Sequence, residues 1–154
     1  MSVAGRNRTK YNKSDAKKQL CRFCFTIFAD KEKPDIMILK FDEMELSHLP
    51  AFKGGEKEFA ANMFFDGTNR IFKGCLIPGA SIGVHTHDDS CEVIFILSGN
   101  GRLYEKGSAA DDLPEYKDVT AGDCLYCKKG QTHSLMNPET SESDLIFYAV
   151  VPKQ

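Results

Sequence analysis

Short apolar runs separated by turn residues dominate the chain between residues 36 and 151. Runs of roughly four to eight residues that are rich in β-branched and aromatic side chains are typical of β-strands. The predicted strands are Ile36–Leu39, Phe59–Phe65, Arg70–Ile77, Val84–His87, Glu92–Leu97, Arg102–Tyr104, Lys117–Thr120, Cys124–Cys127, His133–Asn137 and Leu145–Val151. Ten short strands with few helical stretches indicate an all-β sandwich or barrel.

Turn residues separate the predicted strands and set their lengths. The turns lie at Gly54-Gly55, Asp66-Gly67, Pro78-Gly79, Gly99-Asn100-Gly101, Ala121-Gly122 and Asn137-Pro138. The segment Leu97–Arg102 has the form of a β-hairpin, in which Asn-Gly supplies the positive φ angles. We therefore expect the strands on either side of this turn to pair with each other.

The segment before Pro34 has a pattern that fits either a helix or a strand. Ser14 is placed to cap a helix, but the alternation of Phe23, Phe25 and Ile27 is also typical of a strand. The pattern leaves both alternatives open, and the proline ends the segment in either case.

Charge divides the chain into two parts. Residues 1–33 carry nine Lys/Arg and three Asp/Glu, a formal charge of +6, and the remaining residues carry eleven and nineteen, a formal charge of −8. We therefore predict a basic N-terminal extension, residues 1–33, followed by a β-barrel domain, residues 34–154. A basic arm can bind nucleic acid or an anionic surface, but it can also dock on an acidic body or stay solvated. The extension is too short for a helix-turn-helix and lacks its pattern, which disfavours nucleic acid as a partner.

Length and composition restrict the class of protein. With 154 residues, 42% of them apolar and 27% charged, the chain has the size and mix of one globular domain. No stretch reaches the roughly 18 apolar residues of a membrane span, and the N-terminus lacks the apolar region of a secretory signal. We therefore expect a cytoplasmic protein with no membrane partner and with its six cysteines reduced.

Two Cys-x-x-Cys pairs, Cys21/Cys24 and Cys124/Cys127, suggest a thiol-bound metal. The two pairs are too far apart in the chain for a compact zinc site. Cys124 and Cys127 also point to opposite faces of a predicted strand, because side chains alternate along it. We therefore interpret these residues as packing cysteines, which are small and usually buried.

Three of the four histidines lie in two strand regions, together with one acidic residue among apolar neighbours. His85 and His87 are two residues apart, so their side chains leave the same face of a strand about 6–7 Å apart. Glu92 opens an apolar run, where a charge is costly to bury unless it is paired or binds a metal. His133 begins a later strand. On spacing alone, these residues are either ligands of one metal ion or hydrogen-bonded core residues.

The same four residues belong to two longer patterns. The first reads Gly79-ASIGV-His85-Thr86-His87-DDSC-Glu92-VIFILS-Gly99, and the second reads Gly122-DCLYC-Lys128-Lys129-Gly130-QT-His133-SLM-Asn137. Together they resemble the two motifs of the cupin superfamily, with nine of the ten defined positions matched, and flanking strands extend the likeness to about residues 35–151. The departure is Lys128, where the family usually has proline. We expect a looser turn before His133, because proline fixes φ.

The resemblance implies a fold and a metal site. The fold is the cupin-type double-stranded β-helix, a jelly-roll-like barrel with a metal ion inside its wider end, here with a short N-terminal extension. The implied ligands are His85, His87, Glu92 and His133, which bind one divalent transition metal ion: manganese, iron, nickel, cobalt or zinc. Many relatives form dimers by exchanging N-terminal strands, so the resemblance also implies a homodimer in which residues 22–40 pair with the partner barrel.

The implied metal site leads to two function classes. An octahedral ion with four protein ligands keeps two positions for a bidentate oxygen ligand, or for one substrate oxygen and dioxygen. We therefore expect a dioxygenase, decarboxylase or isomerase that acts on a small oxygenated metabolite, such as a carboxylate or a sugar. The alternative is a non-catalytic binding or sensing protein with a structural metal, because one fold hosts many chemistries.

Candidate walls of the substrate pocket are Arg70 and Phe72, which share a strand face, and Tyr126 in a later strand. An arginine near the ion can hold a substrate carboxylate with two hydrogen bonds. The alternative is a surface arginine and two packing aromatics. No catalytic residue is assigned from the sequence.

Overall fold

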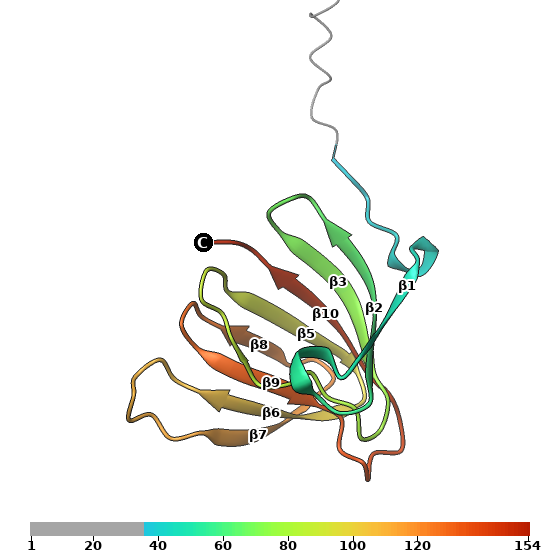
Figure 1. The fold of residues 1–154 in the computed structure, drawn as a ribbon. Coiled ribbons are helices and arrows are strands. Elements are labelled where there is room, and N and C mark those ends of the chain that lie inside the picture. Colours follow the sequence, from blue (N-terminus) through green and yellow to red (C-terminus); the bar gives the residue numbers. More distant parts are fainter. Residues whose placement is uncertain (1–35) are drawn as a thin grey trace, which may run out of the picture. The chain divides into compact units, whose positions relative to one another are not determined.

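The computed structural model describes residues 36–154, and Leu39–Gln154 form one compact unit (Figure 1). The segment after Ser14 and the Cys21/Cys24 pair lie outside the described residues. The predicted division at residue 33 and the exchange of N-terminal strands in a dimer therefore stay predictions. No helix of the described part of the chain is long and apolar enough to cross a membrane.

About half of the described residues lie in strands, and two short 3₁₀ helices stand before and after the first strand. The elements are η1 (Phe41–Glu43), β1 (Leu46–Pro50), η2 (Phe52–Gly54), β2 (Glu58–Phe65), β3 (Arg70–Leu76), β4 (His85–Thr86), β5 (Glu92–Ser98), β6 (Asn100–Lys106), β7 (Glu115–Thr120), β8 (Cys124–Cys127), β9 (Thr132–Met136) and β10 (Leu145–Val151).

The strands form two antiparallel sheets that face each other (Figure 1). One sheet has six strands in the order β1-β2-β3-β10-β5-β8, and the other has four in the order β4-β9-β6-β7. The chain passes repeatedly between the two sheets, as a double-stranded β-helix requires. This topology confirms the predicted all-β class and the jelly-roll-like arrangement.

An apolar core fills the space between the sheets, because each strand turns every second side chain inward. Phe59 and Phe147 are fully buried from the six-stranded sheet, and Leu135 is fully buried from the four-stranded sheet. The rings of Phe59 and Phe147 stack with their centroids 6.0 Å apart. Burial of each such side chain stabilises the folded state by about 1.5–3 kcal/mol, so this core joins the two sheets.

One predicted strand is wrong and one strand was missed. Residues 36–40, which include the predicted strand Ile36–Leu39, have no regular secondary structure, because they pair with no strand among the described residues. Instead, Leu46–Pro50 forms β1, which within residues 36–154 is an edge strand paired with β2 alone. Its sequence LSHLP has no Val, Ile, Thr, Phe or Tyr and ends in proline, which sheets accept mainly at edges, and so it lacks the usual strand pattern.

The predicted hairpin at Leu97–Arg102 is also wrong. β5 and β6 do not pair with each other, because they belong to different sheets. Gly99 joins them with a φ of +82°, whereas Gly101 has a negative φ and lies within β6. A Cβ atom on Gly101 would lie 2.6 Å from the side chain of Leu145, so this glycine serves packing rather than a turn. Local sequence does not distinguish a hairpin from a crossing between sheets.

Candidate metal centre

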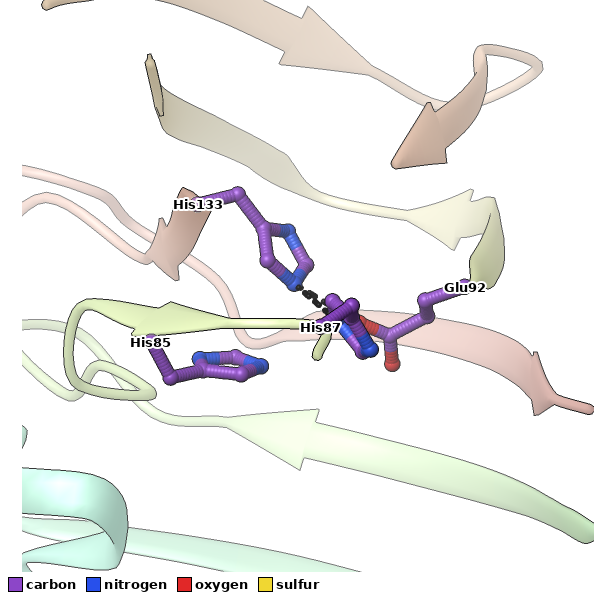
Figure 2. Close-up of side chains that lie close together, drawn as sticks. All are labelled: His85, His87, Glu92 and His133. Carbon is purple, nitrogen blue, oxygen red and sulfur yellow. Dashed lines mark hydrogen bonds and ion pairs between the residues drawn. The ribbon is translucent and has the colours of Figure 1, made fainter. Parts of the chain in front are cut away.

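Four side chains that resemble the metal ligands of cupins meet between the two sheets (Figure 2). His85 opens β4 and pairs with His133 in β9, so the register places their side chains next to each other. His87 follows the end of β4, and Glu92 opens β5. The predicted group of four residues is therefore brought together from three strands and one connecting segment.

The donor atoms lie close enough to bind one ion. One ligand atom from each of the four residues lies within 4.8 Å of all the others. His87 Nε2 lies 3.0 Å from His133 Nε2 and 3.2 Å from Glu92 Oε2, and His133 Nε2 lies 2.8 Å from Glu92 Oε2. His87, Glu92 and His133 are buried, and His85 is partly exposed.

Hydrogen bonds outside the cluster orient two of the rings. His85 Nδ1–H donates to the carbonyl oxygen of Gly83 at 2.9 Å, which leaves Nε2 of this ring without a proton. Nδ1 of His87 lies 2.9 Å from Ser90 Oγ. Partners of this kind fix the ring orientation of metal-binding histidines and make the free nitrogen a better ligand.

Charge interactions keep the cluster ready to bind a cation. Burial alone raises the pKa of Glu92, but hydrogen bonds from His133 and His87 outweigh burial and lower this pKa well below its usual range. Burial lowers the pKa of His85 to about 4, although the bond to Gly83 opposes the shift. At neutral pH the carboxylate is therefore ionised and His85 is neutral, which are the forms that bind metal ions.

The residues fit a divalent metal ion. Ligand atoms about 2.1 Å from one ion and at right angles around it lie about 3.0 Å apart, which matches the triangle formed by His87, Glu92 and His133. Imidazole and carboxylate donors suit manganese, iron, cobalt, nickel or zinc. A buried carboxylate beside three imidazoles also gains a strong compensating charge from such an ion.

Hydrogen bonds close the turn before His133, although Lys128 stands where the cupin motif usually has proline. The Lys128 N–H donates to Gln131 Oε1 at 2.8 Å, and the Gln131 N–H donates to the Lys128 carbonyl at 3.0 Å. Gly130 has a φ of +84°, and its N–H donates to the His87 carbonyl at 2.8 Å. Proline has no N–H, so the bond to Gln131 Oε1 is one that lysine can make and proline cannot.

A cavity of about 1000 Å³ lies beside the cluster and is lined by Glu92 and His133. Residues of β7 and β8 also line it, and each of these strands is at one edge of its sheet within residues 36–154. Its wall is strongly acidic. The carboxylates other than Glu92 are Glu105, Asp111, Asp112, Glu115, Asp118 and Asp123, and the lysines are Lys106 and Lys117.

The three residues predicted to line a pocket lie in different surroundings. Tyr126 lines this cavity and is 56% exposed. Arg70 is exposed at the start of β3, with its guanidinium carbon 5.0 Å from the centre of the Phe65 ring. Phe72 is buried in the core, with its ring centroid 6.3 Å from that of Phe147. Arg70 and Phe72 do not line this cavity.

The cysteines of the described residues are free thiols. Cys127 is buried and Cys124 is exposed, as expected for positions on opposite faces of β8. Burial, followed by the neighbouring Glu92 carboxylate, raises the pKa of Cys127 to about 12. Cys127 is therefore protonated at neutral pH, and it does not belong to the cluster of candidate metal ligands found among residues 36–154.

The fold and the donor set together define a metal-binding cupin. The chain belongs to the cupin domain family, whose sequence model matches residues 72–151. This match confirms the family resemblance seen in the two motifs.

Similar proteins are known from several organisms. The oxalate-binding protein of Thermotoga maritima is 29% identical over 121 residues, which cover 75% of this chain and 93% of that protein. A crystal structure from the same organism, described as a predicted oxalate decarboxylase, has a TM-score of 0.63 and 27% identity, and the match covers 77% of this chain and all of that one. The oxalate decarboxylase of Lactobacillus farciminis, solved with formate, has a TM-score of 0.60 and 19% identity over 79% of this chain and 34% of its own, and shows the fold alone.

Proposed function

We propose that this protein binds one divalent transition metal ion through His85, His87, Glu92 and His133, and that a small carboxylate such as oxalate binds at this ion. The observation that carries the proposal is the convergence of the four donor groups in one cluster. The matches from Thermotoga maritima support the carboxylate, because the protein sequence is named for binding oxalate and the crystal structure is described as a predicted oxalate decarboxylase.

Charge supports an anionic ligand at the ion. Three neutral imidazoles and one carboxylate around a divalent ion leave a net charge of about +1. Such an ion acts as a Lewis acid and as a template for a ligand with two oxygen donors. The chain's own contribution is to hold the donor rings in place, through the bonds of His85 to Gly83 and of His87 to Ser90.

Metal content tests the first half of the proposal. Purified full-length protein should hold close to one transition metal ion per chain, measured by inductively coupled plasma mass spectrometry. His87→Ala and Glu92→Gln should lose most of it. His48→Ala is the matched control, because His48 is an exposed histidine that pairs with Glu58 outside the cluster. A metal-free, folded wild-type protein that takes up no added Mn²⁺, Fe²⁺, Co²⁺, Ni²⁺ or Zn²⁺ would contradict the proposal.

Calorimetric titration with oxalate tests the second half. Metal-loaded wild-type protein and His48→Ala should bind oxalate at one site per chain, and His87→Ala should not. If the metal-loaded wild-type protein binds no oxalate, formate, malonate or pyruvate, the proposal of a carboxylate ligand is wrong. That result does not contradict the proposed metal site.

A decarboxylase is the second candidate, favoured by the likeness to the predicted oxalate decarboxylase. Decarboxylation breaks the C–C bond of hydrogen oxalate, releases CO₂ and leaves formate. The overall reaction is redox-neutral, so it consumes no oxidant or reductant. Incubation of metal-loaded protein with ¹³C-oxalate under air distinguishes the two. Labelled formate and CO₂ that form with the wild type but not with Glu92→Gln support an enzyme. Saturable oxalate binding without these products supports a binding protein.

A further inference from the structure

The two sides of the metal cluster differ in charge. The cavity beside Glu92 and His133 carries six further carboxylates and two lysines, a formal charge of −4. An anionic ligand is repelled on this side, because like charges in a partly enclosed space interact over several ångströms. His85, which is only partly buried, does not line this cavity. Charge therefore favours the side of His85 for a carboxylate.

The η2 turn places Lys53 on the His85 side. The N–H of Gly83 donates to the carbonyl of Phe52 at 3.0 Å, and the carbonyl of Gly83 accepts from His85 Nδ1. A Cβ atom on Gly83 would lie 2.1 Å from the carbonyl oxygen of Lys53, so the two backbones are in direct contact. Only glycine fits at position 83. The turn is thus joined to His85 through two hydrogen bonds and one close packing contact.

Lys53 has an unusual backbone conformation. Its φ and ψ are 54° and 28°, in the left-handed region that non-glycine residues adopt rarely. A strained conformation of this kind persists where the surrounding structure requires it. The next residue, Gly54, is also left-handed, with a φ of +80° and no atom near its absent side chain. Ala51 and Lys57 nearby are left-handed as well, with φ values of 48° and 54°, so the whole turn holds this conformation and glycine would adopt it at position 53 with less strain.

The side chain of Lys53 lies in the electric field of the cluster. The residue as a whole is exposed, yet partial burial of the ammonium group lowers its pKa, while the Glu92 carboxylate raises it and Arg70 lowers it. In turn, the charge of Lys53 contributes to the lowered pKa of His85. Lys53 takes no part in the ion pairs found within residues 36–154, in contrast to Lys73 and Lys117, which bind acidic side chains.

Arg70 adds a second positive charge at the same end of the six-stranded sheet. It pairs with Val151 in β10, and the preceding residue Val150 pairs with Val93 in β5. Arg70 is therefore two strands away from Glu92 at the same level of the sheet, and both open their strands. Its charge lowers the pKa of Lys53, as expected for two cations in the same region of the fold.

We propose that Lys53 is a specificity-determining residue, whose ammonium group binds the carboxylate oxygens of the ligand that do not contact the metal, with Arg70 as an additional positive charge. This inference rests on the proposed function. It adds a cation that selects anionic over neutral ligands and places the ligand on the His85 side. A ligand with two negatively charged carboxylates is favoured most, because one carboxylate can bind the ion while the other faces the ammonium group.

Variants at Lys53 test the assignment by calorimetric titration of metal-loaded, full-length protein with oxalate. Lys53→Met should weaken oxalate binding at least tenfold, or about 1.4 kcal/mol, while metal content stays near one ion per chain. Lys53→Arg should bind within about threefold of the wild type, since the charge is kept. Lys53→Gly should weaken oxalate binding as much as Lys53→Met does. Because glycine adopts the left-handed conformation without strain, this variant provides the test if Lys53→Met does not fold.

Lys106→Met is the matched control, because Lys106 lies in the acidic cavity on the other side of the cluster. It should leave oxalate affinity within twofold of the wild type. Equal oxalate binding by the wild type and by folded Lys53→Gly, or a larger loss with Lys106→Met, overturns the assignment and leaves the proposed function intact. If the metal-loaded wild type binds no carboxylate, the proposed function fails, and this inference fails with it.

Discussion

Asn137 provides a sharp test of how buried polar groups stabilise the domain. It is 1% exposed, and its Nδ2 donates to the carbonyls of Leu76 at 2.8 Å and Ser143 at 2.9 Å. One side chain therefore joins the end of β3 to the connection that leads into β10. Asn137 matches the last defined position of the second cupin motif, but it is not one of the four clustered donor residues. We expect its role to be structural.

The size of the effect follows from the two hydrogen bonds. Each such bond contributes about 0.5–1.5 kcal/mol, and a buried carbonyl left without a donor costs about 1–3 kcal/mol. Asn137→Ala should therefore lower the free energy of unfolding by about 2–4 kcal/mol, allowing for partial rearrangement of the carbonyls. For a domain of this size, about 4 °C of melting temperature is lost per kcal/mol, so Tm should fall by about 8–16 °C.

Asn137→Asp separates hydrogen bonding from space filling. Aspartate has nearly the same shape, but its ionised carboxylate presents oxygen atoms to both carbonyls, so we expect a loss at least as large as that of Asn137→Ala. Asn62→Ala is the control, because Asn62 is less buried and donates one hydrogen bond, to the Met44 carbonyl at 3.0 Å. It should cost about 1 kcal/mol.

Urea unfolding monitored by circular dichroism measures these differences, and metal content is measured in parallel. The native Asn137 variants should still hold one metal ion per chain. An Asn137→Asp protein within about 0.5 kcal/mol of the wild type at pH 7 would refute the reasoning, because the side chain would then act only as a filler.

Three further predictions concern the glycine between the sheets, the cysteines of β8 and the support of the cluster. Gly99→Ala should destabilise the protein by more than about 2 kcal/mol in urea unfolding, because φ is +82° and the new Cβ would lie 2.4 Å from a backbone carbonyl oxygen. Gly67→Ala, with a φ of +97° and open space, should cost only about 1–2 kcal/mol, and equal losses would contradict the steric argument. Iodoacetamide at pH 8 should alkylate Cys124 in the native protein but not Cys127, whose pKa burial raises to about 12; peptide mass spectrometry checks this, and rapid labelling of Cys127 would contradict it. Ser90→Ala should weaken metal binding about tenfold or more in competition with a chelator, because it removes the partner of a histidine ring, and unchanged affinity would show that the bond is dispensable.

Much of this domain could be inferred from local sequence pattern. Side-chain alternation along a strand is a property of the backbone, so apolar runs such as Leu145–Val151 mark the inward faces without knowledge of their partners. The same alternation places Cys124 and Cys127 on opposite faces of β8. The two motifs also contain all four donor residues of the cluster, since the resemblance carries over residue by residue.

Contacts between distant strands could not be inferred in the same way. His133 reaches within 3.0 Å of His87, 46 residues earlier, only because β4 and β9 pair in one sheet. The turn at Gly99 has the composition of a hairpin, yet it carries the chain from one sheet to the other. Lys53 has no motif around it, and its backbone lies against Gly83, two residues before His85, only through the packing of η2. Backbone pairing and the close approach of loops depend on how the whole chain packs, and spacing along the chain describes neither.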